Sequence, residues 1–187
     1  VLIANSALAR PLHETTFFQR VQLGMELGYT QTFYKYRHYN IVSEQGYRIN
    51  EVAEGFFLHP NGDIMVNIGY DVTDKLNIAM YSGYAGVCDN RRMFPILFRG
   101  SYFPKTIWDD GFFAYAEIGI GISSPLGDIY NNDIALMSDA GGGFRIKLTP
   151  YYNLDFMISL KATFDDPPIS NPDGDGYVLY ENVRSND

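Results

Sequence analysis

The sequence lacks cysteine pairs and long apolar runs. Its one cysteine, Cys88, cannot form a disulfide within the chain, and no Cys and His spacing of the kind that binds zinc is present. The best apolar stretch, residues 112–122, is interrupted by Glu117 and two glycines, whereas a membrane helix needs about 20 apolar residues. We therefore expect no metal and no cofactor, and a chain of this kind would cross a bilayer only as strands.

Basic residues are also scarce. Lys and Arg number 14 against 22 Asp and Glu, which gives a net charge of −8, and they are spread thinly along the chain. A nucleic-acid-binding surface needs a basic stripe that neutralises phosphates. Nucleic acid is therefore not an expected partner.

Aromatic residues and glycine are abundant instead, with 15 Tyr, 13 Phe and 18 Gly among 187 residues. This bias favours β-structure, and the length suits a single domain. We assign residues 20–187 to that domain and residues 1–19 to an N-terminal segment. Ala7, Leu8 and Ala9 have the small-x-small pattern that ends a secretory signal. The segment 1–19 is thus expected to be either a signal remnant or a periplasmic arm.

Seven segments alternate apolar and polar residues with the period of two that half-buried strands show. They span residues 20–38, 63–71, 76–84, 92–103, 112–123, 136–148 and 154–164. Each has about nine residues or more, the length of a tilted strand that crosses a bilayer. Short connections at 73–75, 104–111 and 149–153 alternate with long polar ones at 39–62, 124–135 and after Asp165, and the short connection 88–91 breaks this rule. Short turns at one rim and long loops at the other are typical of outer-membrane barrels.

The two faces of these segments differ in kind. One face is apolar and almost free of charge. The other is rich in Gly and carries few charges, of both signs: Glu26, Glu117, Asp139 and Asp155 against Arg99, Arg145, Lys147 and Lys161. Opposite charges can pair in a confined interior, whereas a Lys or Arg that faces lipid at the bilayer midplane costs roughly 2–4 kcal/mol. We therefore expect the apolar face to contact lipid and the polar face to enclose a packed ionic network.

Aromatic residues gather where the segments meet their connections, as in the interfacial girdles of membrane barrels. One expected girdle lies at the short-turn rim and comprises Tyr70, Tyr102, Phe103, Trp108, Phe112, Phe113, Tyr151 and Tyr152. The other comprises Tyr34, Tyr36, Tyr39, Tyr84 and Tyr130.

Three stretches carry a resemblance to a known family: "GYDVTDKLNIAMYSGY" (69–84), "FPILFRGSYF" (94–103) followed by "FFAYAEIGIGIS" (112–123), and "GGGFRIKLTPYYNLDFMISLKATF" (141–164). Over residues 20–165 the chain resembles small outer-membrane β-barrels of the OmpA/OmpX type, in particular the porin-like barrels of Bacteroidota. The resemblance implies an all-β, transmembrane, antiparallel up-and-down barrel of about eight strands in the bacterial outer membrane. Its partners would be membrane lipid, including lipopolysaccharide, and it leaves open contact with other outer-membrane proteins.

The eighth strand is not evident from the alternation. Either residues 177–184 form it, or the closing strand lies beyond Asp187 and is absent from this chain. We favour the second interpretation, because "GYVLYENVRSND" is short and polar for a strand that spans lipid.

Three functions fit these features. The first is a barrel with a side-chain-filled interior that acts as a structural or binding subunit through its loops 39–62 and 165–187, alone or within a larger envelope complex. The second is a soluble lipocalin-like barrel that binds an apolar ligand inside. The third is a lipid-modifying enzyme, but His13, His38 and His59 lack the His-x-Ser pattern of such a site. We expect no catalytic residues and regard His38 as a hydrogen-bonded structural residue.

Residues 171–182 contain a weak calcium motif. Asn171, Asp173, Asp175 and Gly176 match the start of a calcium-binding loop, but position twelve is Asn182 where the pattern requires Glu. A simple turn explains the same residues, so calcium binding is a minor hypothesis.

Overall fold

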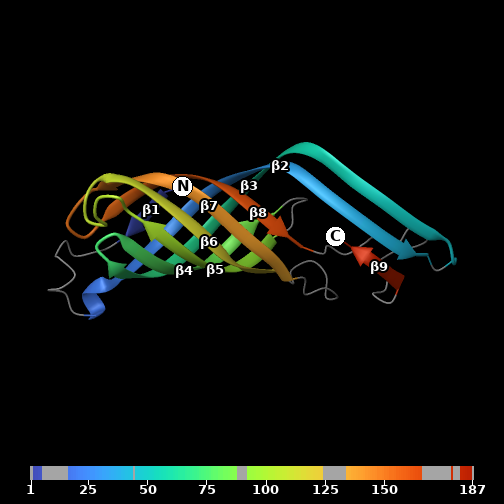
Figure 1. The fold of residues 1–187 in the computed structure, drawn as a ribbon, viewed down its shortest axis with the longest axis horizontal. Coiled ribbons are helices and arrows are strands. Elements are labelled where there is room, and N and C mark those ends of the chain that lie inside the picture. Colours follow the sequence, from blue (N-terminus) through green and yellow to red (C-terminus); the bar gives the residue numbers. More distant parts are fainter. Residues whose placement is uncertain are drawn as a thin grey trace.

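A computed structural model describes residues 2–5, 17–43, 45–87, 92–123, 134–165, 178 and 182–186. Its elements are a short 3-10 helix, Phe17–Arg20, and nine strands. The strands are β1 (Leu2–Asn5), β2 (Val21–Val42), β3 (Arg48–Thr73), β4 (Leu76–Gly86), β5 (Arg92–Tyr102), β6 (Gly111–Ser123), β7 (Ile134–Lys147), β8 (Asn153–Phe164) and β9 (Val183–Asn186). Strands β2 to β8 pair antiparallel with their neighbours in chain order, and the sheet curls about one long axis (Figure 1). The prediction of an all-β, antiparallel up-and-down sheet is confirmed.

All seven predicted strands are present. Their bounds differ from the alternating segments by one or two residues at most ends, as for β6 and β8. The exceptions are the end of β2 and the start of β3, which extend beyond the alternating segments 20–38 and 63–71. The short connections 73–75, 104–111 and 149–153 join neighbouring strands as expected.

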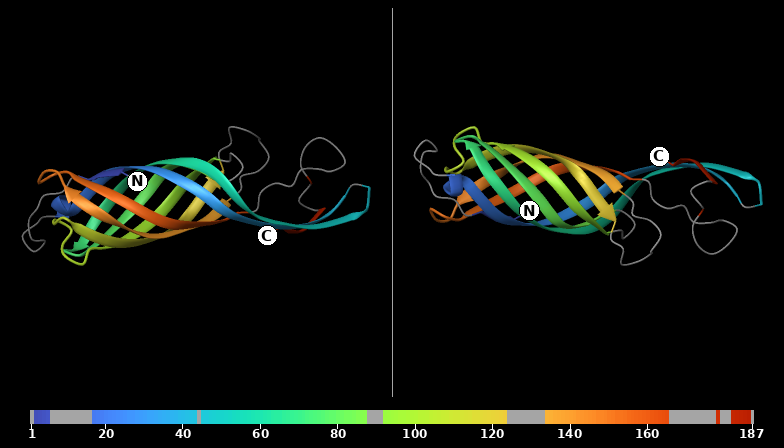
Figure 2. Two further views of the ribbon diagram at one scale, coloured as in Figure 1. Left: turned by 90° about the horizontal axis from the view of Figure 1, so that it is seen from above. Right: turned by 90° about the horizontal axis from the view of Figure 1, so that it is seen from below.

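The long connection 39–62 is not the polar loop that we expected. Residues 48–62 belong to β3, and β2 pairs with β3 from Val21 to Val42, with one register shift between Thr32 and Tyr34. The two strands project past the others as a two-stranded blade (Figure 2), which we call the arm and define as residues 33–59. Strand β9 pairs with β2 at Tyr39, Asn40 and Ile41 and lies along the arm (Figure 1).

The place beside β8 is taken by β1 and not by a strand near the other end of the chain. Leu2 pairs with both Leu27 of β2 and Phe156 of β8, and Asn5 pairs with both Gly24 and Asn153. The expectation of a closing strand beyond Asp187 stays a prediction. Strand β1 meets the two edges at the end of the sheet that holds the short turns. The pairing of β1 covers four residues on each side.

Burial separates the two faces of the curled sheet as the alternation predicts. The apolar side chains that point away from the lumen, which is the space enclosed by the sheet, remain exposed. We call them the outer belt: Leu23, Met25, Leu27, Ile64, Val66, Ile68, Ile78, Met80, Phe94, Ile96, Phe98, Ile118, Ile120, Ile122, Leu136, Phe144, Ile146, Phe156, Ile158 and Leu160. The lumen-facing residues are buried, charged ones included: Arg99 is 2% exposed and Arg145 is 4% exposed, whereas Ile158 is 82% exposed.

Glycine allows the sheet to curl tightly. A Cβ at Gly83, Gly119, Gly141 or Gly143 would come closer than 3.0 Å to backbone atoms of the neighbouring strand. Gly100, on the outer face, has open space where its Cβ would be. Lumen-facing glycine is therefore required at these sites by the close approach of adjacent strands.

Candidate functional site

The middle of the lumen is filled by one guanidinium group. Arg99 on β5 donates from Nε to Glu117 Oε2 at 2.7 Å and from Nη1 to Glu26 Oε2 at 2.9 Å. Its planar head lies between two aromatic rings, 4.0 Å from the centroid of Tyr81 and 4.3 Å from that of Tyr115. One cation thus joins β2, β4, β5 and β6 through charge-assisted hydrogen bonds and cation–π contacts, which gain strength where water is excluded.

A second cluster fills the lumen near the short turns. Arg145 on β7 donates to both carboxylate oxygens of Asp155 on β8, at 2.8 and 2.6 Å, and to the carbonyl of Ile107 at 3.2 Å. Phe103 packs 4.4 Å below the same guanidinium group. Such a bidentate pair fixes both geometry and charge.

Asp71 lies in the same region, and its hydrogen-bond donors are uncharged amide groups. It is fully buried, and its carboxylate accepts hydrogen bonds from Gln22 Nε2 at 2.8 and 2.7 Å and from Asn77 Nδ2 at 2.7 Å. Amide donors from β2 and β4 therefore satisfy this carboxylate.

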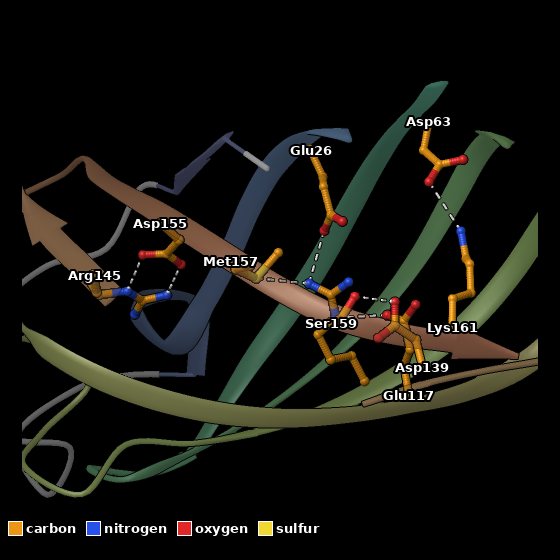
Figure 3. A network of polar contacts seen from close by, with 10 residues as sticks. Glu26, Asp63, Glu117, Asp139, Arg145, Asp155, Met157, Ser159 and Lys161 are labelled. Atoms are coloured by element: carbon orange, nitrogen blue, oxygen red, sulfur yellow. Dashed lines mark hydrogen bonds and ion pairs between the residues drawn. The ribbon is translucent and has the colours of Figure 1, made fainter. Parts of the chain in front are cut away.

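The other end of the lumen holds smaller contacts (Figure 3). Asp63 Oδ2 accepts from Lys161 Nζ at 3.1 Å and from Thr30 Oγ1 at 2.7 Å, and Ser159 Oγ donates to Asp139 Oδ2 at 3.0 Å. The remaining carboxylate oxygens, Asp63 Oδ1 and Asp139 Oδ1, are buried without a hydrogen-bond partner. The carboxylates of this end are therefore less completely satisfied than Asp71 and Asp155, whose oxygens all accept hydrogen bonds.

The interior charges predicted from the sequence are brought together, with one exception. Glu26, Arg99, Glu117, Arg145, Asp155, Lys161 and Asp139 all lie in the lumen, and Asp63 joins them as a partner of Lys161. Lys147 is only half-buried and lies at the short-turn rim, where its backbone N–H donates to Asp110 at 2.6 Å. The alternation could show which side chains share a face, but not which of them lie at the same height.

A small enclosed space lies in the lumen between Gln22, Tyr81, Arg99, Phe113 and Arg145. It measures about 10 Å³, which is room for about one water molecule. This part of the lumen is therefore filled by side chains and offers neither a solute channel nor an apolar ligand cavity.

A larger recess lies where the arm leaves the curled sheet. It measures about 630 Å³ and is open to the outside. Its lining comprises Tyr29, Pro60, Asn61, Gly62, Tyr84, Gly86 and Arg92. The Arg92 guanidinium lies 5.8 Å from the Tyr84 ring centroid, and Asn61 Nδ2 donates to the Val87 carbonyl at 3.1 Å. Aromatic surface beside a cation makes this recess a candidate binding surface.

The arm presents two different faces. One face carries the exposed apolar and aromatic residues Tyr34, Tyr36, Val52 and Phe56 together with Glu54 and His38, and the rings of Tyr34 and Phe56 meet edge to face at 5.6 Å. The opposite face carries Lys35, Arg37, Tyr39 and Glu51. We call the first the aromatic face of the arm. Exposed apolar residues grouped on a projecting blade mark an interaction surface.

Polar cross-strand pairs stabilise the arm. Tyr34 Oη donates to Glu54 Oε2 at 3.3 Å, Arg48 Nε donates to Asn40 Oδ1 at 2.8 Å, and Tyr39 Oη donates to Glu51 Oε2. The hydrogen bond to the Glu51 carboxylate, together with partial burial and the charge of Glu51, raises the pKa of Tyr39.

Two expected girdle residues point inward instead. Phe103 and Phe113 are 3% and 5% exposed, stack at 5.1 Å between ring centroids, and pack beneath Arg145. Their assignment to the short-turn girdle is wrong, because each has the lumen-facing parity of its strand and covers a buried cation. Phe112, Tyr102, Tyr151 and Tyr152 are exposed near that rim as expected. Tyr34 and Tyr36 lie on the arm, and Tyr130 lies outside the described residues.

The remaining candidate residues do not form a site. His38 Nε2 donates to Asn50 Oδ1 at 2.9 Å on the arm, which fits a hydrogen-bonded structural role. His13 and the calcium motif residues Asn171, Asp173, Asp175 and Gly176 lie outside the described residues. Within the described ranges, no group of three or more His, Cys, Asp or Glu side chains is arranged to hold a metal ion.

The chain was compared with known families, proteins and structures. No family model, curated protein or solved structure matches this chain. A search of the described residues for helices long and apolar enough to cross a membrane found none.

Proposed function

We propose that this protein is an outer-membrane β-barrel whose filled lumen provides rigidity and whose arm binds a partner. The outer belt is the observation that carries the proposal. A soluble protein rarely exposes so many contiguous apolar side chains, and here the charges are the buried groups. Lipid chains are the surroundings in which such a belt is favourable and buried charges can remain enclosed.

The filled lumen supports a structural or binding role over transport. Arg99 and its aromatic and acidic neighbours occupy the middle of the lumen, and the space beside them holds about one water molecule. A lipocalin-like function would need an open apolar cavity, whereas the described interior is filled by charged groups and by packed apolar side chains such as Met93, Leu97 and Met137. A lipid-modifying function would need an activated nucleophile beside a base, and His38 pairs with an asparagine instead.

The arm is the part of the described chain best suited to protein recognition. Its aromatic face is exposed on a two-stranded blade that extends beyond the other strands (Figure 2). Aromatic side chains dominate the energetics of most protein interfaces. The partner is thus expected to contact Tyr34, Tyr36 and Phe56, as part of an envelope assembly.

Two measurements test this proposal. Cell fractionation should place the protein in the outer membrane, and its migration on a gel should change on heating, as for folded barrels. A photoreactive amino acid at Phe56 should then crosslink to a partner protein, whereas the same group at Ala53, on the opposite face of the arm, should crosslink far less. A protein found in the soluble fraction would contradict the membrane assignment, and equal crosslinking from both faces would contradict the role of the aromatic face.

A further inference from the structure

The recess at the base of the arm lies on the outer side of the curled sheet. Tyr29 pairs with Gly62 across β2 and β3, and Gly86 pairs with Arg92 across β4 and β5. Tyr29, Gly62 and Arg92 are exposed and have the outward parity of the outer belt on their strands. The recess therefore opens toward the surroundings of the outer belt, at the end of the sheet opposite the short turns.

Two glycines help to form this hollow. Gly62 and Gly86 stand where β3 leaves β4, next to the last residue pair of those two strands. Neither glycine has a side chain to cover the backbone, whereas the residues paired with them, Tyr29 and Arg92, carry long side chains. The volume of about 630 Å³ lies within the range of small-molecule sites, roughly 300–1,000 Å³. The recess is thus large enough for one small polar group with its substituents.

The charge of the recess is positive. Arg92 lines it, and no acidic side chain of the described residues does. The chain as a whole has the opposite balance, with 22 Asp and Glu against 14 Lys and Arg. The Arg92 side chain is exposed, and its guanidinium lies 5.8 Å from the centroid of the Tyr84 ring. An exposed guanidinium group favours an anion, and its planar donors match the oxygens of a phosphate group.

The outer belt begins next to the recess. Tyr84 pairs with Ile64, which pairs with Leu27, and the Tyr84 ring meets that of Phe94 edge to face at 5.9 Å. Leu27, Ile64 and Phe94 are exposed members of the outer belt. One continuous surface therefore offers a cation and, beside it, apolar side chains. This combination suits a molecule that has an anionic head and apolar tails.

We propose that the recess binds the phosphorylated headgroup of a membrane lipid, with the phosphate on Arg92 and the acyl chains over Leu27, Ile64 and Phe94. Tyr84 lies between these two parts, as aromatic rings do at a membrane interface. The inference rests on the proposed contact of the outer belt with lipid. It goes beyond the proposed role of the arm, because it assigns a lipid site to residues that lie outside 33–59.

Native mass spectrometry of the full chain, released from micelles of an uncharged detergent, tests the proposal. The probes are phosphatidic acid, diacylglycerol with the same acyl chains, and inorganic phosphate. Phosphatidic acid should bind at one site and at least about tenfold more tightly than diacylglycerol, because only the first offers an anion to Arg92. Equal affinities for the two lipids would overturn the site. Inorganic phosphate that binds as tightly as phosphatidic acid would overturn the assignment to a lipid.

Two variants locate the bound lipid. Arg92→Gln should weaken the binding of phosphatidic acid about tenfold, whereas Lys75→Gln, which removes an exposed positive charge at the opposite rim, should leave it unchanged. Gly62→Val should weaken binding to a similar extent by filling the recess, and its backbone tolerates a Cβ, which would meet only the Gly28 carbonyl oxygen at 3.9 Å. Gly100→Val, on the outer face with open space around its Cβ, is the matched control. Wild-type affinity in either Arg92→Gln or Gly62→Val would overturn the site.

Failure of the proposed function would look different. A chain that stays in solution without detergent, and whose migration on a gel does not change on heating, would contradict the membrane assignment and this inference with it. A chain that inserts into vesicles of uncharged lipid and migrates as a folded barrel, but binds phosphatidic acid no better than diacylglycerol, would overturn the lipid site alone.

Discussion

The same two strands behave differently in the two halves of their length. Between Val21 and Thr32, β2 lies in the curled sheet and buries Gln22 and Glu26 against the lumen while Leu23 and Leu27 remain exposed. In the arm, most apolar and polar side chains of β2 and β3 are exposed together, whereas Asn40 and Ile41, where β9 pairs with β2, are buried. An isolated two-stranded hairpin is marginally stable in water. Stability is therefore expected to reside in the sheet, and recognition in the arm.

The comparison extends to charge. In the lumen, Arg99 and Arg145 are nearly inaccessible and each contacts a carboxylate and an aromatic ring. In the arm, ionisable groups such as Glu51 and Glu54 pair with tyrosine hydroxyls at the surface. Buried pairs are costly to break because the remaining partner stays uncompensated, whereas surface pairs contribute little. Substitutions in the two regions should therefore differ greatly in effect.

The largest effect is expected at the centre of the lumen. Arg99→Leu leaves Glu26 and Glu117 buried without their cation and should lower the free energy of unfolding by about 3–5 kcal/mol. Urea unfolding in lipid vesicles measures this change. The triple variant that also carries Glu26→Gln and Glu117→Gln should recover part of the loss, because no unpaired charge remains. A loss below about 1 kcal/mol for Arg99→Leu would contradict the proposed role of the network, since surface pairs have that size.

The next effect tests the outer belt. Ile118→Arg places a charge on the outer face at the middle of β6 and should cost roughly 2–4 kcal/mol in a bilayer. The same substitution at Phe56, on the arm, should change stability by no more than about 0.5 kcal/mol, as for other surface sites. Vesicle unfolding compares the two. Equal small effects at both positions would show that the outer belt is not in contact with lipid.

A smaller loss of stability is expected when a glycine that allows the sheet to curl is replaced. Gly119→Ala brings a Cβ against the backbone of Ile96 and Leu97 on β5 and should cost about 1–3 kcal/mol through overpacking. Gly100→Ala is the matched control, because its Cβ would meet nothing within 4 Å. Samples are heated before gel electrophoresis, and the temperature at which the band of the folded form disappears measures the difference in stability. Similar behaviour of the two variants would mean that the strands can separate at no cost.

The smallest effect concerns the arm and alkaline pH. The Glu51 carboxylate raises the pKa of Tyr39, so the contribution of this pair is complete below the ordinary tyrosine pKa of about 10 and is lost as pH rises through the raised value. In Tyr39→Phe, the tyrosinate absorbance titration should lose one step that lies above the ordinary tyrosine pKa. Glu51→Gln should move that step toward ordinary values. Loss of a step at the ordinary pKa in Tyr39→Phe would contradict the pairing.

The alternation identified the strands of the sheet because their two faces have different surroundings. Segments such as 112–123 and 154–164 repeat apolar and polar residues every second position, and this repeat also shows which charges face the lumen. The sequence alone thus predicted that Arg145 points into the lumen and that Ile158 points away from it.

Other features could not be predicted, for physical reasons. Both faces of the arm are largely exposed, apart from Asn40 and Ile41, so residues 39–62 carry no clear alternation and were expected to form a loop. Phe103 and Phe113 are aromatic residues at strand ends, and composition alone does not distinguish a girdle from a stack beneath Arg145. Strand β1 has four residues, too few for a period to be visible, and the partners of Lys161 and Asp63 depend on the tilt of strands that are far apart in the sequence.

The contact of the outer belt with lipid is the central claim, and fluorescence quenching by brominated lipids tests it directly. In a Trp108→Phe background, a single tryptophan is placed at Ile118 on the outer face or at Phe113 in the lumen, and the protein is reconstituted in vesicles with bromine atoms on the acyl chains. Strong quenching of the tryptophan at 118 and weak quenching of that at 113 is the predicted result. Equal, weak quenching at both positions, with the protein remaining in solution without detergent, would contradict it.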